Sequence, residues 1–198
     1  MTSARFFARR RAFGLLLAGT LPTLHGPAAA QEVLIETARK GELITLIASA
    51  EMQVDTGTVW GVISDYDHLA EFIPDMHSSR VIEREGDDVL VEQTGQIGFL
   101  VFQQPVKVRL EVHESPQRLI EAHAVGGNLK EMEGRYALER LPSGAVRLTY
   151  SGRLVPGFAV PPVIGTLLVR NLLSEQFTAL VREIVRRDLA ARRAPPTQ

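Results

Sequence analysis

Residues 106–112 alternate strictly between apolar and polar side chains, and this alternation is typical of a β-strand with one buried face. The apolar positions of the segment are Val106, Val108, Leu110 and Val112. Further strand-like segments follow one another from residue 80 to residue 154, separated by short turn signals that contain glycine or proline. Successive hairpins of this kind predict an antiparallel sheet with one apolar face, and that face needs a cover.

The C-terminal part of the chain supplies the predicted cover. From residue 163 to about residue 191, apolar residues recur every three or four positions, as in an amphipathic helix. The apolar face of this helix consists of Val169, Leu173, Phe177, Leu180 and Ile184. Residues 42–54 read as a first strand, which brings the sheet to about seven strands. We therefore expect an α+β domain in which the sheet wraps around one long helix.

Two short helices are predicted between the first strand and the rest of the sheet, within residues 58–76. Aspartate residues precede both helices, and aspartate is a favoured N-cap. Pro74 ends the second helix, because the residue before a proline is pushed out of the α region. We expect Trp60 and Phe72 to be buried beside the long helix.

This stretch also resembles the signature of a known superfamily. Trp60, Asp65-Tyr66, Phe72-Ile73-Pro74 and Met76 resemble the pattern VWxVLxDYxxLxxFxPxM of the START-like (SRPBCC) helix-grip superfamily. Within it, the chain is similar to the polyketide cyclase/dehydrase and coenzyme Q-binding branch. The resemblance extends over about residues 42–190. It implies the helix-grip fold, a bent antiparallel sheet of about seven strands around a long C-terminal helix, with two short helices after the first strand.

The resemblance further implies a ligand cavity between the sheet and the helix. Its expected lining is Phe99, Val101, Val108, Leu110, Met132, Tyr136, Leu148, Tyr150, Leu173 and Phe177. An apolar set with two phenols is typical of a small-molecule pocket with a few orienting polar groups. For each of these residues, packing in a filled core remains the alternative.

An apolar loop with proline and glycine precedes the long helix at residues 154–160 and includes Phe158. The first half of the helix is apolar on its far side too, so that it must be buried or touch something apolar. Two interpretations remain open. The loop and the helix either add to the core under the two short helices, or they form a pocket mouth, with Phe158 at the ligand site and transient membrane contact through residues 154–160.

The N-terminus is predicted to be a cleaved secretory signal over residues 1–30. Its basic region consists of Arg5, Arg9, Arg10 and Arg11. An apolar region and three consecutive alanines before Gln31 complete the pattern, and Arg10-Arg11 also fits a twin-arginine signal. An ordinary signal is the alternative to the twin-arginine route. We expect a mature domain over residues 31–193, located in the periplasm or secreted, and a disordered tail at residues 194–198.

Charge and composition exclude several classes of function. The chain has 22 basic and 23 acidic residues, and removal of the four arginines of the signal leaves a net charge of −5. This charge argues against a nucleic-acid-binding protein, which usually presents a basic face. The absence of cysteine excludes thiol catalysis, cysteine-ligated zinc and iron–sulfur clusters. The sequence implies no metal or cofactor, and we expect a monomer.

No catalytic motif is present in the sequence. The histidines are not paired at metal-ligand spacing, and neither a Gly-x-Ser-x-Gly elbow nor a P-loop occurs. One hypothesis is therefore an exported carrier for an apolar small molecule, such as a lipid, a quinone or an aromatic polyketide-like compound. Another is a polyketide cyclase/dehydrase-like enzyme that uses the same cavity, with Tyr136, Tyr150 and His123 as candidates for proton transfer. A domain with a filled core and no ligand is a third alternative.

Overall fold

A computed structural model of the protein describes residues 33–99, 102–159 and 165–194. Within these ranges the strands are β1 (Val33–Lys40), β2 (Leu43–Met52), β3 (Met76–Glu85), β4 (Asp88–Phe99), β5 (Phe102–Ser115), β6 (Leu119–Gly127), β7 (Leu129–Arg140) and β8 (Val146–Pro156). The helices are α1 (Thr56–Ile63), the 3-10 helix η1 (Tyr66–Glu71) and α2 (Gly165–Arg193). These elements belong to one compact unit, residues 31–198.

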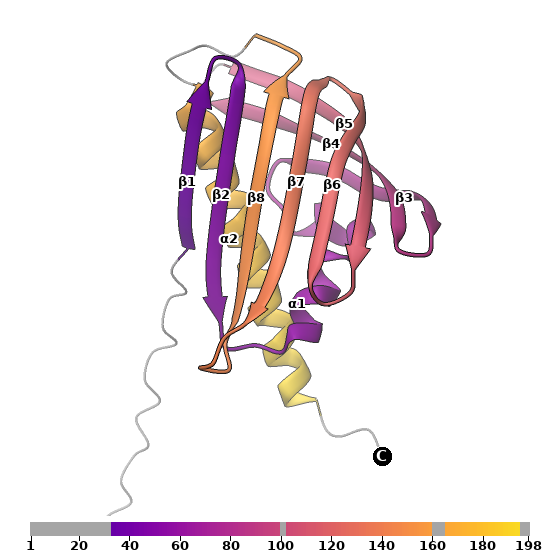
Figure 1. Cartoon of the computed structure of the whole chain (residues 1–198), viewed down its shortest axis with the longest axis vertical. Coiled ribbons are helices and arrows are strands. Elements are labelled where there is room, and N and C mark those ends of the chain that lie inside the picture. Colours follow the sequence, from indigo (N-terminus) through magenta and orange to yellow (C-terminus); the bar gives the residue numbers. More distant parts are fainter. Residues whose placement is uncertain (1–32, 100–101, 160–164, 195–198) are drawn as a thin grey trace, which may run out of the picture. The chain divides into compact units, whose positions relative to one another are not determined.

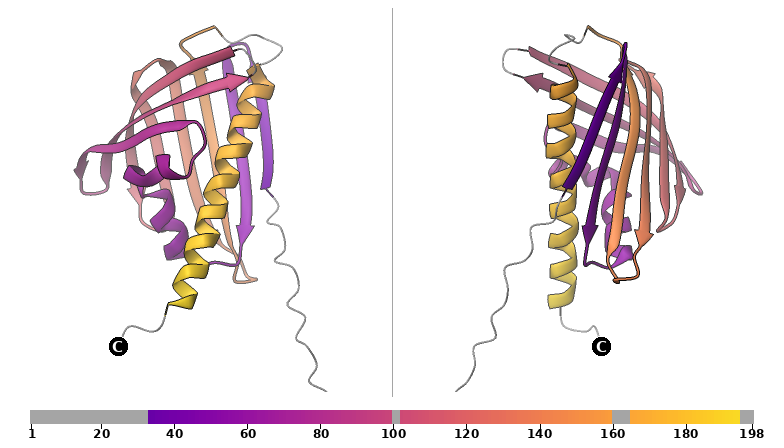
Figure 2. Two further views of the ribbon diagram at one scale, coloured as in Figure 1. Left: turned by 180° about the vertical axis from the view of Figure 1, so that it is seen from behind. Right: turned by 60° about the vertical axis from the view of Figure 1, so that its left-hand side comes forward.

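The strands form one antiparallel sheet in the order β1-β2-β8-β7-β6-β5-β4-β3, so that β1 and β3 are its edges. The sheet is strongly bent, and α2 lies along its concave side (Figures 1 and 2). Helices α1 and η1 link β2 to β3, and α1 packs against α2. This arrangement confirms the predicted α+β helix-grip fold. Among the described residues, no helix has the length and hydrophobicity that a membrane crossing requires.

The predicted apolar face of α2 is buried along its whole length. Its members are Val169, Leu173, Phe177, Leu180 and Ile184, and each is at most 9% exposed. The helix packs against β1, β2 and β4. Burial of apolar surface contributes ~25 cal/mol per Å², so this face supplies a large part of the stability of the domain.

The sheet has one strand more than predicted. β1 precedes the predicted first strand and pairs with β2 through a turn at Gly41, whose φ of +62° favours glycine. Since β1 is an edge strand, its inward residues are only half buried and its apolar alternation is weak. β4 continues through Gly95 without a break. A Cβ atom at this glycine would lie 2.4 Å from the backbone oxygen of Asp75, so the glycine permits a close approach of two backbones.

The corner between β2 and β3 contains two short helices, as predicted, but it buries different residues. Asp55 caps α1, because its Oδ1 accepts a hydrogen bond from the backbone N–H of Gly57 at 2.7 Å. The buried residues of α1 are Val59, Val62 and Ile63. Trp60 and Phe72 are only partly buried, so the prediction for these two residues was wrong. Successive helical residues are turned by about 100°, which places Trp60 beside the buried face and not at its centre.

An ion-pair network ties α2 to this corner. Glu183 is 9% exposed and accepts hydrogen bonds from Arg186 Nε at 2.6 Å and Arg187 Nε at 2.7 Å. Arg187 also donates to Asp65 Oδ2 at 2.9 Å, next to the start of η1. The hydrogen bond from Arg186, and then the one from Arg187, lowers the pKa of Glu183 to about 2.

The free energy of unfolding is therefore expected to depend on Glu183 in acid. A carboxylate whose pKa is lowered by folding contributes stability above the pKa of the unfolded chain, and this contribution is lost as the pH falls through the folded pKa. For Glu183 this window runs from the ordinary value of 4.5 down to about 2. Urea unfolding across the window should give a shallower decline for Glu183→Gln than for the natural chain. Glu139→Gln, at an exposed ion pair with Arg147, serves as the control, and equal slopes for both variants would contradict the prediction.

Candidate ligand-binding cavity

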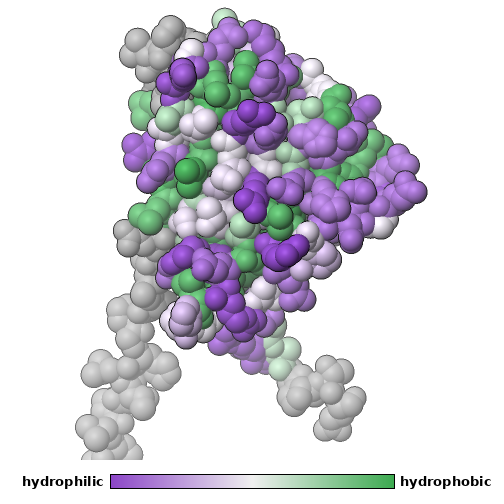
Figure 3. Space-filling model, in the orientation of Figure 1, coloured by the Kyte–Doolittle hydropathy of each residue, from purple (hydrophilic) through white to green (hydrophobic). Residues whose placement is uncertain are grey.

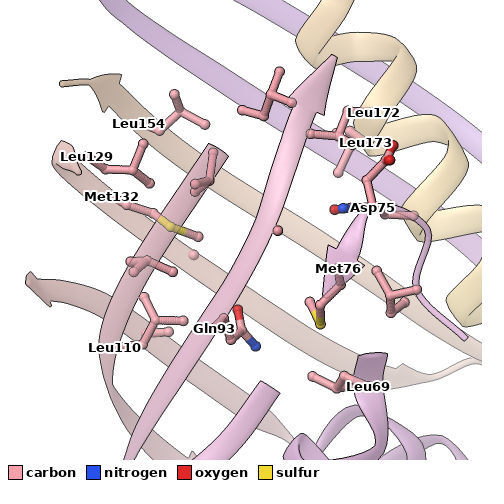
Figure 4. A pocket seen from close by; sticks show the side chains of 18 of the residues that line it. Leu69, Asp75, Met76, Gln93, Leu110, Leu129, Met132, Leu154, Leu172 and Leu173 are labelled. Carbon is pink, nitrogen blue, oxygen red and sulfur yellow. The ribbon is translucent and has the colours of Figure 1, made fainter. Parts of the chain in front are cut away.

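A cavity of about 280 Å³ lies between the concave face of the sheet, α2 and the segment that joins η1 to β3 (Figure 4). Its lining is mostly apolar because the inward positions of the strands carry aliphatic residues. On β5 these are Val106, Val108, Leu110 and Val112, the residues of the alternating segment. Small-molecule pockets usually span ~300–1,000 Å³, so this cavity suits a compact ligand.

Most of the predicted site residues line this cavity. They are Val108, Leu110, Met132, Tyr136, Tyr150, Phe158, Leu173 and Phe177. Leu148 points to the same side of the sheet but is completely buried in the core and does not belong to the lining. Val101 and the side chain of Phe99 lie outside the described residues. Ligand binding by these residues stays a prediction.

The predicted phenols, Tyr136 of β7 and Tyr150 of β8, are neighbours in the cavity wall. Their ring centroids are 4.8 Å apart, and the rings are tilted by 44°. Burial raises the pKa of both hydroxyl groups, to about 12 for Tyr150. Both phenols therefore stay protonated at neutral pH and retain an O–H donor for a ligand oxygen. A Cβ atom at Gly152 would lie 2.6 Å from the Tyr150 hydroxyl oxygen, so this glycine makes room for the phenol.

The sequence analysis missed the polar part of the lining. Besides the phenols it consists of Asp75, Gln93, Thr94, Gln96 and Gln176. A signal for Gln93 was present, because this residue takes an inward position of β4 after the buried Val89 and Val91. Its Nε2 donates to the Oγ of the buried Ser79 at 3.2 Å, and its side chain lies at the cavity (Figure 4). The amide is therefore held in place by the protein.

The segment between η1 and β3 closes one side of the cavity. Asp75 has a φ of +59°, which is strained for a residue with a side chain. Gln96 holds it from β4, since the Gln96 backbone N–H donates to the Asp75 carbonyl oxygen at 2.9 Å and Gln96 Nε2 donates to Asp75 Oδ1 at 3.0 Å. From α2, Gln176 Nε2 donates to the Pro74 carbonyl oxygen at 3.0 Å. The segment is thus fixed to both the sheet and the helix.

A third phenol, Tyr66 of η1, also lines the cavity. Among the described residues, its buried hydroxyl group makes no hydrogen bond of good geometry, although the carboxylate of Glu114 lies beside it. Burial raises the pKa of this hydroxyl, and the negative charge of Glu114 raises it further. Arg84 holds Glu114 through two hydrogen bonds of 3.1 and 3.2 Å. Tyr66 is part of the Asp65-Tyr66 pair that resembles the superfamily pattern. This match was the one sequence feature that could have pointed to Tyr66 as a site residue.

The remaining candidate for proton transfer, His123, lies outside the cavity. It is on the convex side of β6, where its Nε2 is 3.0 Å from a carboxylate oxygen of Glu111 and both side chains are exposed. This side of the sheet is mainly hydrophilic (Figure 3). Within the part of the chain that the structure describes, no group of three or more histidine, cysteine or acidic residues could hold a metal ion.

The fold and the cavity agree with a family comparison. The family described as "Polyketide cyclase / dehydrase and lipid transport" matches residues 52–181, which include the β2–β3 corner and the cavity-lining part of α2. The chain belongs to this family. The match confirms the resemblance to the polyketide cyclase/dehydrase proteins, while the coenzyme Q-binding part of that resemblance stays a prediction. β1 and nearly all of β2 precede the matched residues.

Solved structures share the fold at low sequence identity. The Zhui aromatase/cyclase from a Streptomyces species is 12% identical with a TM-score of 0.63, over 79% of this chain and 99% of that one. A STAR-related lipid transfer protein from Xanthomonas axonopodis is 15% identical with a TM-score of 0.62, over 81% and 96%. A START superfamily protein from Mycobacterium smegmatis is 15% identical with a TM-score of 0.58, over 74% and 98%. No curated protein matches the chain in sequence.

Proposed function

We propose that the chain is an exported binding protein that holds an apolar small molecule in this cavity and does not convert it. The lining carries the proposal, because its described residues are mostly apolar, with three phenols, three glutamine amides, the hydroxyl group of Thr94 and a single carboxylate, that of Asp75, which already accepts a hydrogen bond from Gln96. General acids and bases work best when their pKa lies near the operating pH, and burial raises the pKa of all three phenols away from neutrality. A lipid, a quinone or an aromatic polyketide-like compound fits this description.

An enzyme of the cyclase/dehydrase kind is the second candidate. It is favoured by the family, which includes cyclases as well as lipid-transport proteins, and by the paired phenols in the cavity wall. Such an enzyme would shape an aromatic precursor and transfer a proton from one of these hydroxyl groups.

Mass spectrometry of organic extracts tests the main proposal. We expect an apolar compound to co-purify with the natural chain and to keep its mass when it is incubated with fresh protein. A compound that disappears in favour of a product would support the enzyme. If no compound is extracted and the protein takes up no apolar dye, the cavity is not a binding site.

Tyr136→Phe separates binding from catalysis. The change removes one hydrogen bond, worth ~0.5–1.5 kcal/mol, so a carrier should lose at most about tenfold in affinity for an oxygen-bearing ligand. An enzyme that uses this phenol as its acid should lose ~10²–10⁴-fold in turnover and still bind. Binding titrations and product analysis of the same preparation measure both quantities. Tyr150→Phe is measured in parallel, because the neighbouring hydroxyl group is the other candidate acid in the cavity wall.

Export is a separate proposal, since residues 1–32 lie outside the described part of the chain. We propose that residues 1–30 direct export and are removed, which leaves a mature domain over residues 31–193. In the twin-arginine hypothesis, replacing Arg10 and Arg11 by lysine should block export, because that route reads the arginine pair itself. Cell fractionation measures the result. Export of the lysine variant at the natural level would favour an ordinary signal.

The ligand is proposed to enter past residues 154–160, with transient membrane contact there. Phe158 lines the cavity and is only partly buried. Nearby on α2, Leu168 lines the cavity while Leu167 is 51% exposed, so apolar side chains face both the interior and the solvent at the start of this helix. We further propose that the protein acts as a monomer, since the cavity is built within one chain.

A further inference from the structure

The described lining of the cavity contains almost no charged side chains. Among the described residues that line it, none is lysine, arginine or histidine, and the one charged residue is Asp75. The structure does not describe residues 100–101 and 160–164, and the sequence has no charged residue in either segment. Of the 22 basic residues in the chain, 18 lie in the part that the structure describes, and none of these 18 lines the cavity.

Two arginines near this region are already engaged with carboxylates. Arg84 pairs with Glu114 behind Tyr66, and Arg187 pairs with Glu183 and Asp65. Neither arginine belongs to the lining. A ligand carboxylate or phosphate in the cavity would therefore lose its hydration, find no positive partner and meet the negative charge of Asp75.

Apart from Asp75, the polar groups of the described lining are neutral hydrogen-bonding groups. The Tyr136 and Tyr150 hydroxyls remain protonated donors, and Gln93 adds an amide that Ser79 holds in place. Hydroxyl and carbonyl oxygens match these groups and need no counter-charge. From this lining we infer that the cavity selects uncharged ligands bearing hydroxyl or carbonyl groups over carboxylates and phosphates. The inference rests on the proposed binding function and narrows its ligand class.

A matched pair of small ligands tests the selection. Naphthalenemethanol and naphthoate share a ring system and differ in charge, and the binding of each is measured by its displacement of the neutral dye Nile red from the protein. At neutral pH the alcohol is expected to bind at least about tenfold more tightly than the carboxylate. As the pH is lowered toward about 4, near the ordinary pKa of a carboxyl group, the difference should begin to shrink because a growing fraction of the naphthoate becomes neutral. The affinity for the alcohol should change little.

Asp75→Asn provides the protein side of the test. Asparagine tolerates the left-handed backbone at this position and keeps an oxygen for the hydrogen bond from Gln96, so that only the charge is removed. We expect the affinity for naphthoate to rise several-fold, and by a larger factor than any change in the affinity for the alcohol. Asp87→Asn, in the exposed β3–β4 turn, removes the same charge away from the cavity and should alter neither affinity.

The outcomes separate this inference from the proposed function. Binding of naphthoate as tight as that of the alcohol would overturn charge selection and leave the binding function in place. Equal effects of the Asp75 and Asp87 variants would also overturn it, because the discrimination would then come from the overall charge. If neither the dye nor either naphthalene compound binds, the proposed function fails and the inference fails with it.

Discussion

Leu110→Trp is expected to abolish ligand uptake and to leave the fold intact. Leu110 lies near the middle of the β5 wall, is 6% exposed and points into the cavity (Figure 4). An indole at this position would occupy much of the 280 Å³ that a ligand needs. Overpacking a core costs ~1–3 kcal/mol, which a domain with a stability of ~5–15 kcal/mol can absorb. Nile red titration and mass spectrometry of extracts measure the uptake.

The control for this variant is Leu189→Trp. Leu189 is also on a regular element, α2, but is 46% exposed and does not line the cavity. Its replacement should leave both dye binding and the extracted compound unchanged. Circular dichroism and urea unfolding establish that each variant is folded. If folded Leu110→Trp takes up ligand as the natural chain does, the ligand site lies elsewhere on the protein.

The fold could be predicted because its two main determinants are periodic in the sequence. Apolar residues recur at every second position in residues 106–112 and at every third or fourth position on the buried face of α2. The buried side of each element can therefore be predicted from its own sequence alone. The edge strand β1 could not be predicted from its pattern, because it pairs on one side only and its inward residues are half buried. Trp60 was misplaced because residue size does not specify which face of a short helix is inside.

The apolar residues that line the candidate site could be predicted from the sequence, but most of its polar residues could not. Val108, Leu110 and Tyr136 follow from strand alternation once the concave face is known. Asp75 reaches the cavity through a backbone with a φ of +59°, close against Gly95 of a strand some twenty residues away. No periodicity encodes such a contact, since it depends on how two distant segments meet. The same holds for His123, whose strand showed no clear inward face in the sequence and which lies on the convex side.

Phe177→Ala is expected to cause the largest loss of stability among single changes on α2. The Phe177 side chain is 2% exposed and belongs to the predicted core face that packs on the sheet. Phenylalanine-to-alanine changes in cores cost ~3–5 kcal/mol through lost transfer energy and a new void. Since Phe177 already borders the ligand cavity on one side, fewer contacts are lost, and we expect a value near ~3 kcal/mol.

Alanine variants of two less buried aromatic residues, Trp60 and Phe158, test whether the loss of stability follows burial. Trp60→Ala should cost roughly half the value for a buried aromatic, because Trp60 is only partly buried. Phe158→Ala should cost less than ~1 kcal/mol, since the residue lies in a partly exposed segment outside the core, while ligand uptake becomes slower. Urea unfolding gives the three free energies, and stopped-flow dye binding gives the rate of uptake. A loss for Phe177→Ala no greater than that for Phe158→Ala would mean that the sheet does not depend on this helix face, and the proposed division between a structural core and a ligand mouth would fall with it.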